Sequence, residues 1–402
     1  MMQPNVDRIP TSHGGNLPRP EAFDALLMEG ERRREAIVAA LPGAVDDVIA
    51  RQVDCGLDIV NDGEYVKAAG GGNYGSYIFG RLAGYSLEPV DPTQEPKRDI
   101  SGARDRDEFP GFYESGLWYS GSGGPIRPGF STPGAPPPVT KEYVCTGPLA
   151  YTGHDAIAAD VAAIVDGLRG RDQIGFIAAL GPLSLAAGRR NEHYPDEESY
   201  LVAAAEAMRE EYRAITDAGL VLQIDEPEFT TGWQFHPEFD VDQYRFYLER
   251  CVEVINHSTD GLPRDQIRIH TCWGSGHRPH TQDIELRHIA DLFVKIRAQV
   301  YAVESSNVRH AHEWRVWEDV KLPEGTKLMP GVVGHATDLV EHPELVAERL
   351  LRFASVVGKE HLEAGTDCGI GSRVGHAEVV WAKLRALSQG AALASAELWR
   401  RG

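Results

Sequence analysis

The stretch Ile267-Arg268-Ile269-His270-Thr271-Cys272 is a short apolar run that ends in an imidazole and a thiol. Similar apolar runs recur along the chain, separated by longer segments of helical periodicity. The expected strands lie near residues 8–13, 57–61, 174–180, 220–224, 266–272, 299–304, 327–333 and 361–368. Strands that alternate with helices indicate βαβ units and a parallel sheet, and this series of eight runs predicts a closed (β/α)8 TIM barrel.

The segments between these runs carry apolar residues at the spacing of an amphipathic helix. The expected helices cover residues 20–51, 154–168, 196–218, 241–256, 281–298, 343–357 and 377–394, and a shorter helix follows His310. A single barrel accommodates a chain of 402 residues when it carries insertions. We therefore predict one barrel domain over residues 1–402.

Residues 85–145 do not fit the alternating pattern. This stretch follows the second expected strand and is rich in proline, glycine and aromatic residues. A long loop without regular structure is uncommon inside a compact domain, and an ordered one is often a lid or a binding loop. We predict a long insertion after strand 2, which serves as a lid or arm or, alternatively, as an oligomer contact or surface decoration.

The composition excludes several classes of protein. The formal net charge is −20, and an acidic surface repels the phosphate backbone of nucleic acids and anionic lipids. No apolar run is long enough to cross a bilayer, and residues 1–10 lack the pattern of a signal peptide. We therefore expect a cytoplasmic protein with small-molecule partners, no nucleic-acid partner and no membrane partner, and homo-oligomer formation stays open.

The five cysteines divide into two kinds of context. An odd, dispersed set does not resemble a secreted disulfide framework, so each residue is a packing thiol, a metal ligand or a nucleophile. Cys55, Cys145 and Cys251 lie in segments expected to be helices or loops and are interpreted as packing residues. Cys272 and Cys368 lie at the ends of expected strands.

The active site of a parallel barrel lies at the carboxyl ends of its strands, and these ends carry reactive side chains here. His270 and Cys272 are two residues apart on one strand, so they point to the same side. With Glu304 and Cys368 from other strand ends they form a set suited to tetrahedral zinc. The alternative is a buried cysteine beside a histidine bonded to a backbone carbonyl, but the shared position at one rim favours the metal.

Four protein ligands are typical of a structural zinc, whereas a site on the catalytic rim indicates chemistry. The four protein ligands and the position on the catalytic rim are compatible if Glu304 leaves the metal when a substrate thiol binds. Zinc then holds that thiol as a thiolate, whereas a free thiol is only a few per cent ionised at neutral pH. The chemistry predicted from the residues is S-alkylation.

Several motifs occur in the order in which one known family carries them. They are Pro10–Arg19, Asp62-Gly63-Glu64, Gln223–Pro227, Ile269–Gly274, Glu304-Ser305-Ser306, Met329–Val333, Val340–Glu344 and Asp367-Cys368-Gly369. The chain thereby resembles the C-terminal catalytic barrel of cobalamin-independent methionine synthases and their single-barrel relatives, which include epoxyalkane:coenzyme M transferases. The resemblance covers most of the chain outside residues 85–145.

The resemblance implies a barrel of the methionine synthase/uroporphyrinogen decarboxylase-like type, with Zn²⁺ held by His270, Cys272, Glu304 and Cys368. It also implies that Glu64 and Asp225 bind the amino group of a homocysteine-like thiol. In the family, a Gly-Ser turn near the N-terminus contacts the substrate carboxylate. The corresponding turn here includes Gly14 and Asn16, so the serine is replaced.

Other residues are assigned with an open alternative. His335 lies near the family's proton-donating histidine and is either a general acid or a helix cap, while Asp225 is counted with it as catalytic. Arg19 and the cluster His277–His280 are candidates for an anionic substrate tail, although a solvated loop is the favoured interpretation of the cluster. Trp273 is predicted to contact substrate, because Cys272-Trp273-Gly274 resembles the single-barrel group.

The resulting function is a zinc-dependent transferase that moves a methyl or alkyl group to a thiol. Methyl transfer to a homocysteine-like thiol is the first reading, and epoxide opening by a thiol such as coenzyme M is the second. A zinc hydrolase or lyase on the same barrel and a non-catalytic ligand binder are alternatives of other classes. A second barrel, which folate-dependent family members carry, is not expected in this chain.

Overall fold

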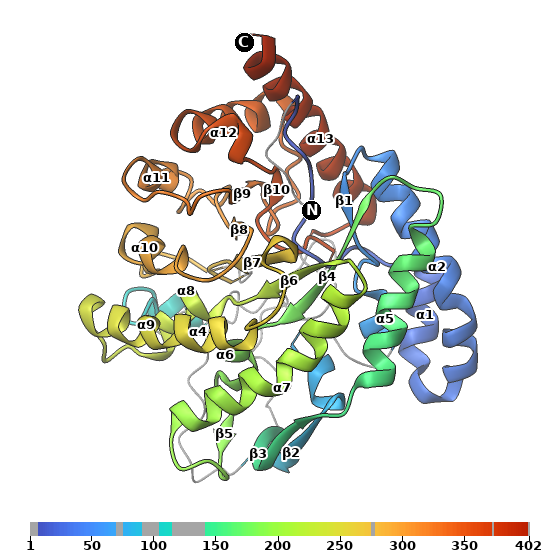
Figure 1. Ribbon diagram of the computed structural model, residues 1–402, viewed down its shortest axis with the longest axis vertical. Coiled ribbons are helices and arrows are strands. Elements are labelled where there is room, and N and C mark those ends of the chain that lie inside the picture. Colours follow the sequence, from blue (N-terminus) through green and yellow to red (C-terminus); the bar gives the residue numbers. More distant parts are fainter. Residues whose placement is uncertain are drawn as a thin grey trace.

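The computed structural model describes residues 7–69, 75–90, 104–114, 141–274, 278–371 and 374–400. Its centre is a seven-stranded sheet in the order β1-β4-β6-β7-β8-β9-β10, with all neighbours parallel. The strands are β1 (Ile59–Val60), β4 (Ile174–Leu180), β6 (Val221–Asp225), β7 (Ile267–Thr271), β8 (Val300–Val303), β9 (Lys327–Val333) and β10 (Gly365–Thr366). Figure 1 shows the helices arranged around these central strands.

The longer helices are α1 (Glu21–Glu29), α2 (Arg34–Asp54), α5 (His154–Gly167), α7 (Glu197–Asp217), α8 (Glu228–Phe235), α9 (Val241–Ser258), α12 (Pro343–Val357) and α13 (Ala377–Arg400). Short ones are α3 (Tyr65–Ala69), α4 (Pro110–Glu114), α6 (Pro182–Ala186), α10 (Ala290–Phe293) and α11 (Val316–Asp319). Local chemistry sets their starts, since Asp240 and Gln243 form a capping box at α9. No helix in the described ranges is long and apolar enough to cross a membrane.

The central strands are buried on both faces, as expected for a sheet covered by helices. In β4, Ile177 and Ala179 belong to the large core beneath the helices, whereas Phe176 and Ala178 belong to a separate apolar cluster. This alternation follows the two-residue period of a strand. Arg268 of β7 is buried on the same side as Phe176, with its guanidinium 4.3 Å from the centre of that ring.

Residues Pro10–Ser12 lie between the two edge strands of the sheet. The amide of Ala364 donates to the carbonyl of Pro10, and the amide of Ser12 donates to the carbonyl of Ala364. On the other side, the amides of Asp58 and Ile59 both donate to the carbonyl of Thr11. The expected strand at residues 8–13 is thus reduced to an isolated parallel bridge between Thr11 and Ala364.

A second, three-stranded sheet lies outside the central one and consists of β2 (Leu82–Pro89), β3 (Lys141–Tyr151) and β5 (Arg190–Asn191). Strands β2 and β3 pair antiparallel, so the ends of the stretch 85–145 are regular rather than irregular. The expectation of a helix or loop around Cys145 was wrong for the same reason, because Cys145 pairs with Tyr85 in this ladder. Between the two strands the structure describes residues 104–114.

The helix expected at residues 281–298 is also wrong. The segment forms a 3-10 turn at Leu286–His288 and the single turn α10. Its apolar residues are buried at helical spacing. However, side chains form hydrogen bonds with backbone groups that would otherwise pair within a helix. The Trp273 indole donates to the carbonyl of Ile284, and the Glu313 carboxylate accepts from the amide of Leu286. Local hydrogen bonds of this kind compete with the helical ladder.

A buried ion cluster joins the second sheet to the helices. The Arg81 guanidinium lies 2.8 Å from an Asp160 oxygen and 3.1 Å from a Glu211 oxygen. The hydroxyls of Tyr77 and Tyr151 donate to Glu211 as well, each at 2.6 Å. Burial raises the pKa of Asp160 to about 6, although the Arg81 charge opposes the rise.

Replacement of Arg81 therefore leaves two buried carboxylates without their cation. We expect Arg81→Met to lower the free energy of unfolding by about 3 kcal/mol, since breaking a buried ion pair leaves an uncompensated charge. Urea denaturation followed by circular dichroism measures this loss. The matched control is Arg169→Met, which removes an exposed pair with Asp166 and is expected to change little. Equal losses in the two variants would contradict the expectation.

Candidate functional site

The carboxyl ends of the central strands carry most of the polar residues predicted for the site. Asp225 ends β6, and His270 lies near the end of β7. Glu304 follows β8 directly, and Cys368 follows β10 by two residues. Because β6, β7, β8, β9 and β10 are consecutive neighbours in the sheet, these side chains share one rim.

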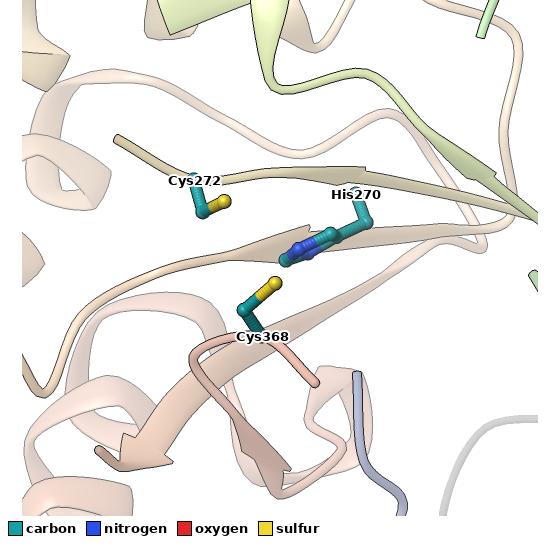
Figure 2. A group of neighbouring side chains, drawn as sticks. All are labelled: His270, Cys272 and Cys368. Carbon is teal, nitrogen blue, oxygen red and sulfur yellow. The ribbon is translucent and has the colours of Figure 1, made fainter. Parts of the chain in front are cut away.

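Two of these residues, His270 and Cys368, form with Cys272 a group that could hold a metal ion. The ligand-type atoms of His270, Cys272 and Cys368 all lie within 4.8 Å of one another. Figure 2 shows both sulfur atoms directed toward the imidazole, with His270 in β7, Cys272 directly after that strand and Cys368 in another segment. The same-side placement of His270 and Cys272 is the one that their spacing of two residues predicts.

The environment of His270 supports a metal at this position. The residue is only 2% exposed, and neither of its ring nitrogens has a hydrogen-bond partner among the residues that the structure describes. A buried polar atom without a partner is costly, so it calls for a ligand. One imidazole and two thiols suit a borderline-soft ion. Within the described ranges no backbone carbonyl bonds to this imidazole, which disfavours the alternative of a histidine held by the backbone.

The two thiols of this group differ in acidity. Cys272 and then His270 lower the pKa of Cys368 well below its usual range, against the opposing effect of burial. Cys368 in turn raises the pKa of Cys272, and burial adds to that rise. The group thus favours thiolate character at Cys368, which is the form that binds metals.

Glu304 belongs to a second group, with His335 and Asp367. Its carboxylate accepts from the Trp273 amide at 2.8 Å and from the Asn307 side-chain amide at 3.0 Å. Burial raises the pKa of Glu304. The structure brings Glu304 to the rim but groups it with His335 and Asp367 rather than with the thiols, so its role as fourth ligand stays a prediction.

His335 is buried after β9, with its Nδ1 atom 4.0 Å from an Asp367 oxygen. No group in the described part of the chain is a hydrogen-bond partner of its Nε2 atom. Burial alone would lower the pKa of His335, but Asp367 and the charge of Glu304 outweigh it and raise this pKa to about 9. Asp367 itself is fixed by the amides of Ser305 and Ser306, each at 2.8 Å. The geometry thus offers a buried, carboxylate-supported imidazole beside the metal-type group.

Asp367 is a residue of this site that the sequence reasoning did not single out. Its position directly before Cys368, at the end of an expected strand, is the signal that could have identified it.

Glu64 and Asp225 form a buried acidic pair. Burial raises the pKa of Glu64 to about 7, and the charge of Asp225 adds to the rise. Burial likewise raises the pKa of Asp225 to about 6, and its oxygen accepts from the Gln223 side chain at 2.7 Å. Glu64 has a φ of 64°, a left-handed conformation that is rare outside glycine and concentrates at functional sites.

The N-terminal turn packs between the metal-type group and the acidic pair. A Cβ atom on Gly14 would lie 2.4 Å from the backbone carbonyl carbon of Cys368. A Cβ atom on Gly15 would lie 2.7 Å from Oε1 of Glu64, and Gly15 has a φ of 142°. Only glycine fits these approaches. Asn16 holds the turn, because its backbone and side-chain oxygens both accept from the amide of Gly371 at 3.0 Å.

Comparison with known proteins places this rim in a family. Residues 179–392 match the family model described as the catalytic domain of cobalamin-independent synthase. This match covers more than half of the chain and includes His270, Cys272, Glu304, His335 and Cys368. The chain belongs to the cobalamin-independent synthase family.

Two curated relatives of this family member differ in activity. The 2-hydroxypropyl-CoM lyase of Xanthobacter autotrophicus is 24% identical, over 97% of this chain and 96% of that protein. The methionine synthase of Pyrococcus horikoshii is 25% identical, over 56% of this chain and 59% of that protein. The chain is therefore matched over nearly the full length of the lyase and over somewhat more than half of the synthase.

Solved structures of the family share its fold. A B12-independent methionine synthase from Shewanella sp. W3-18-1, in complex with selenomethionine, superposes with a TM-score of 0.67. It is 21% identical, and the superposition covers 98% of this chain and 99% of that one. A putative vitamin-B12 independent methionine synthase from Listeria monocytogenes gives a TM-score of 0.63 at 17% identity, covering 96% and 98% of the two chains. These likenesses support an α/β fold built on a parallel sheet of the methionine synthase type.

The remaining predicted residues of this family member lie in other surroundings. Arg19 pairs with Asp24 of α1 and is about one-third exposed, so its predicted substrate contact stays a prediction. Trp273 is 1% exposed, and its indole donates to the carbonyl of Ile284 at 2.7 Å. Of the cluster His277–His280, His277 lies outside the described residues. Arg278 is engaged with Asp283 at 2.9 Å rather than with solvent.

His280, Asp283 and His310 form a third metal-type group, but their contacts are those of an ion network. His310 places Nδ1 2.8 Å from Glu313 and Nε2 3.2 Å from Asp283. Burial opposes charge on His310, yet these carboxylates raise its pKa to about 9. Both ring nitrogens of His310 are thus held by carboxylates, and the Arg278 guanidinium pairs with Asp283, so hydrogen bonds and ion pairs account for this group. The sequence reasoning missed this network, for which only the spacing of His280 and Asp283 gave a hint.

Proposed function

We propose that this protein is a zinc-dependent transferase that moves a methyl or alkyl group to a homocysteine-like thiol. The observation that carries the proposal is the convergence of His270, Cys272 and Cys368, with both His270 nitrogens unpartnered, on the rim that also holds the Glu64 and Asp225 acids. Membership of the cobalamin-independent synthase family supports the reaction class. Its partners are then a small thiol and a methyl or alkyl donor.

We also propose that the parallel sheet closes into a complete barrel. Pro10–Ser12 serves as the remaining strand and closes the parallel sheet into an eight-stranded barrel, since it is hydrogen-bonded toward both edges. The chain from residue 1 to 402 is one barrel domain. Residues 85–145 are its long insertion, with β2 and β3 as the paired stem.

His270, Cys272 and Cys368 would hold the zinc ion, with Glu304 as the exchangeable fourth ligand. When bound, zinc lowers the pKa of a substrate thiol and keeps it in the nucleophilic thiolate form at neutral pH. Glu304 is suited to exchange because it lies on the same rim and already has two other hydrogen-bond donors, the amides of Trp273 and Asn307.

Glu64 and Asp225 would bind the ammonium group of the thiol substrate. A cation between two buried carboxylates restores the charge balance that burial disturbs, so substrate binding stabilises their ionised forms. The turn at Gly14–Asn16 would approach the substrate carboxylate with its backbone. A thiol with a sulfonate tail, such as coenzyme M, would instead bring an anion toward these acids, and this favours an aminothiol.

His335 would supply the proton for the leaving group. The thiolate sulfur forms a bond to the methyl or alkyl carbon, the bond from that carbon to the donor atom breaks, and the donor atom takes a proton from Nε2 of His335. The absence of a protein partner for this atom and the support of Nδ1 by Asp367 suit such a role.

The variant His335→Gln tests this role. We expect kcat to fall about 100-fold, the lower range for loss of a general acid, while KM for the thiol changes little because thiol binding lies with other residues. Steady-state kinetics at pH 7 provide both constants. The control His342→Gln removes the side-chain cap of α12 and should leave kcat unaltered. A kcat equal to that of the unmodified enzyme would exclude His335 as the general acid.

Epoxide opening by a thiol is the second candidate function. The near full-length match to the 2-hydroxypropyl-CoM lyase favours it. In that reaction His335 would protonate the epoxide oxygen, so the same residues serve both chemistries. The acidic pair remains the observation against an anionic thiol.

A matrix of substrates decides between the candidates. Homocysteine, coenzyme M and glutathione are each combined with 5-methyltetrahydrofolate, methylcobalamin and a small epoxide, and the products are measured by mass spectrometry. The proposal predicts a methylated or alkylated aminothiol. A product from coenzyme M alone would establish the second candidate. Hydrolysis or elimination without a thiol product would indicate a zinc hydrolase or lyase, and no turnover with any pair would indicate a ligand binder.

A further inference from the structure

Residues 104–114, the described segment between β2 and β3, contact the residues that follow β6 and β7. Arg104 anchors the segment at the end of α8, where its guanidinium donates to the carbonyls of Trp233 and Phe239 at 2.8 and 2.9 Å. The same guanidinium lies 3.4 Å from the centre of the Trp233 ring. The segment is thus held against the loops that follow β6 and β7.

Asp105 is the buried end of this contact. Its side chain is 0% exposed, and its Oδ1 atom accepts from the Gln282 amide at 2.8 Å and from the Thr281 hydroxyl at 2.9 Å. Its Oδ2 atom lies 3.6 Å from the Arg278 guanidinium. Burial of a carboxylate is costly unless the carboxylate is paired. The nearby Arg278 guanidinium therefore stabilises the buried Asp105 carboxylate.

Arg278 links Asp105 to the backbone next to the candidate metal group. Its side chain is 4% exposed and lies between Asp105 and Asp283. From there its Nη2 atom donates to the carbonyl of Trp273 at 2.5 Å. Trp273 directly follows Cys272, one of the three converging residues.

Further contacts hold both the backbone and the ring of Trp273. Its amide donates to Glu304 at 2.8 Å, and its ring stacks on His310 with centroids 3.8 Å apart. The next residue, Gly274, has a φ of 82° and so turns the chain immediately after this anchor. Arg278 therefore holds the backbone carbonyl of Trp273, as Glu304 holds the backbone amide of the same residue.

We propose that Asp105 is a positioning residue of the site: brought in by the excursion, it orients Arg278, which fixes the Trp273 peptide and with it the Cys272 thiol. The inference rests on the proposed function for its catalytic consequence. It gives the excursion a role in the reaction that neither decoration nor an oligomer contact explains.

The test compares Asp105→Asn with Glu108→Gln. Glu108 belongs to the same segment and accepts from the Thr281 hydroxyl at 2.7 Å and from the Gln282 side-chain amide at 3.0 Å, but it is exposed, and its contacts within the described residues do not include Arg278. Outer residues that orient metal ligands change metal affinity or activity about 10- to 100-fold when they are replaced. We expect zinc transfer from Asp105→Asn to a chromophoric chelator to be about 10-fold faster, and that from Glu108→Gln to be unchanged.

Kinetics separate positioning from general destabilisation. In Asp105→Asn, kcat should fall about 10-fold while KM for the thiol stays the same, because the ammonium site is not touched. Arg278→Lys keeps the cation but loses the two-pronged contact, so it should reproduce both effects if Asp105→Asn does not fold. The two substitutions together should cost no more than either alone. Identical zinc transfer in Asp105→Asn and Glu108→Gln would overturn the proposal.

Hydrogen exchange measured by mass spectrometry distinguishes failure of this inference from failure of the proposed function. The peptide containing Trp273 should exchange at least about 10-fold faster in Asp105→Asn than in Glu108→Gln, whatever the reaction is. If the unmodified protein binds no zinc or alkylates no thiol, the proposed function fails while exchange still decides the positioning role. Unchanged exchange in Asp105→Asn overturns the positioning role itself.

Discussion

Cys368→Ala is expected to lower the zinc content from about one ion per chain to well below one half and to reduce thiol transfer at least about 10³-fold. A bound metal ion contributes several kcal/mol of activation at a site of this kind, and each 1.4 kcal/mol corresponds to a factor of ten in rate. Removal of Cys368 leaves only one thiol and one imidazole in the converging group. Metal analysis by plasma mass spectrometry and initial-rate kinetics measure the two losses.

The control for this variant is Cys145→Ala. Cys145 is also buried, but it lies in β3 of the outer sheet and is not in the metal-type group. We expect its zinc content and transfer rate to equal those of the unmodified protein. If Cys368→Ala retains full zinc and full activity, the metal centre that the account assigns to this rim is wrong.

Replacement of the acidic pair is expected to abolish the preference for an aminothiol. A site built to bind a substrate N–H group rejects an analogue without it by about 10⁴-fold in kcat/KM. The unmodified enzyme should therefore favour homocysteine over 4-mercaptobutyrate, which lacks the amino group, by about this factor. In Asp225→Asn and Glu64→Gln the ratio should fall to about tenfold or less, chiefly through the loss of homocysteine turnover.

Glu226→Gln is the matched control for that substitution. Glu226 follows Asp225 directly and is also buried, but its carboxylate accepts from the amides of Leu183 and Ser184 at the start of α6. Its loss can lower stability without altering the ratio of the two thiols. A preference ratio that is the same in Asp225→Asn as in Glu226→Gln would remove the acidic pair from substrate recognition.

Much of the fold could be predicted because its signals are local. The expected strands at 174–180 and 327–333 coincide with β4 and β9, and the expected helix at 343–357 coincides with α12. These elements have a clear period and clear boundaries. Residues 281–298 show the limit, since helical spacing of buried side chains is also satisfied by turns whose backbone bonds go to Trp273 and Glu313.

The site residues likewise divide into those that a local pattern predicts and those that tertiary packing brings together. His270 and Cys272 are predictable from the period of one strand, and Cys368 from its place at another strand end. The contact of Asp105 with Arg278 joins residues that are far apart in sequence and leaves no local pattern. Arg19 was a candidate for an anionic substrate tail; the structure shows its pairing with Asp24, and the substrate contact stays a prediction. Such side-chain partners are decided by tertiary packing.

X-ray absorption at the zinc edge, with and without homocysteine, tests the central claim most directly. The account predicts a resting shell with two sulfur donors, from Cys272 and Cys368, and a third sulfur when the thiol is added, with loss of an oxygen donor. A sulfur number that stays the same at saturating homocysteine would contradict the account, because the thiol would then bind elsewhere and would not be activated at this rim.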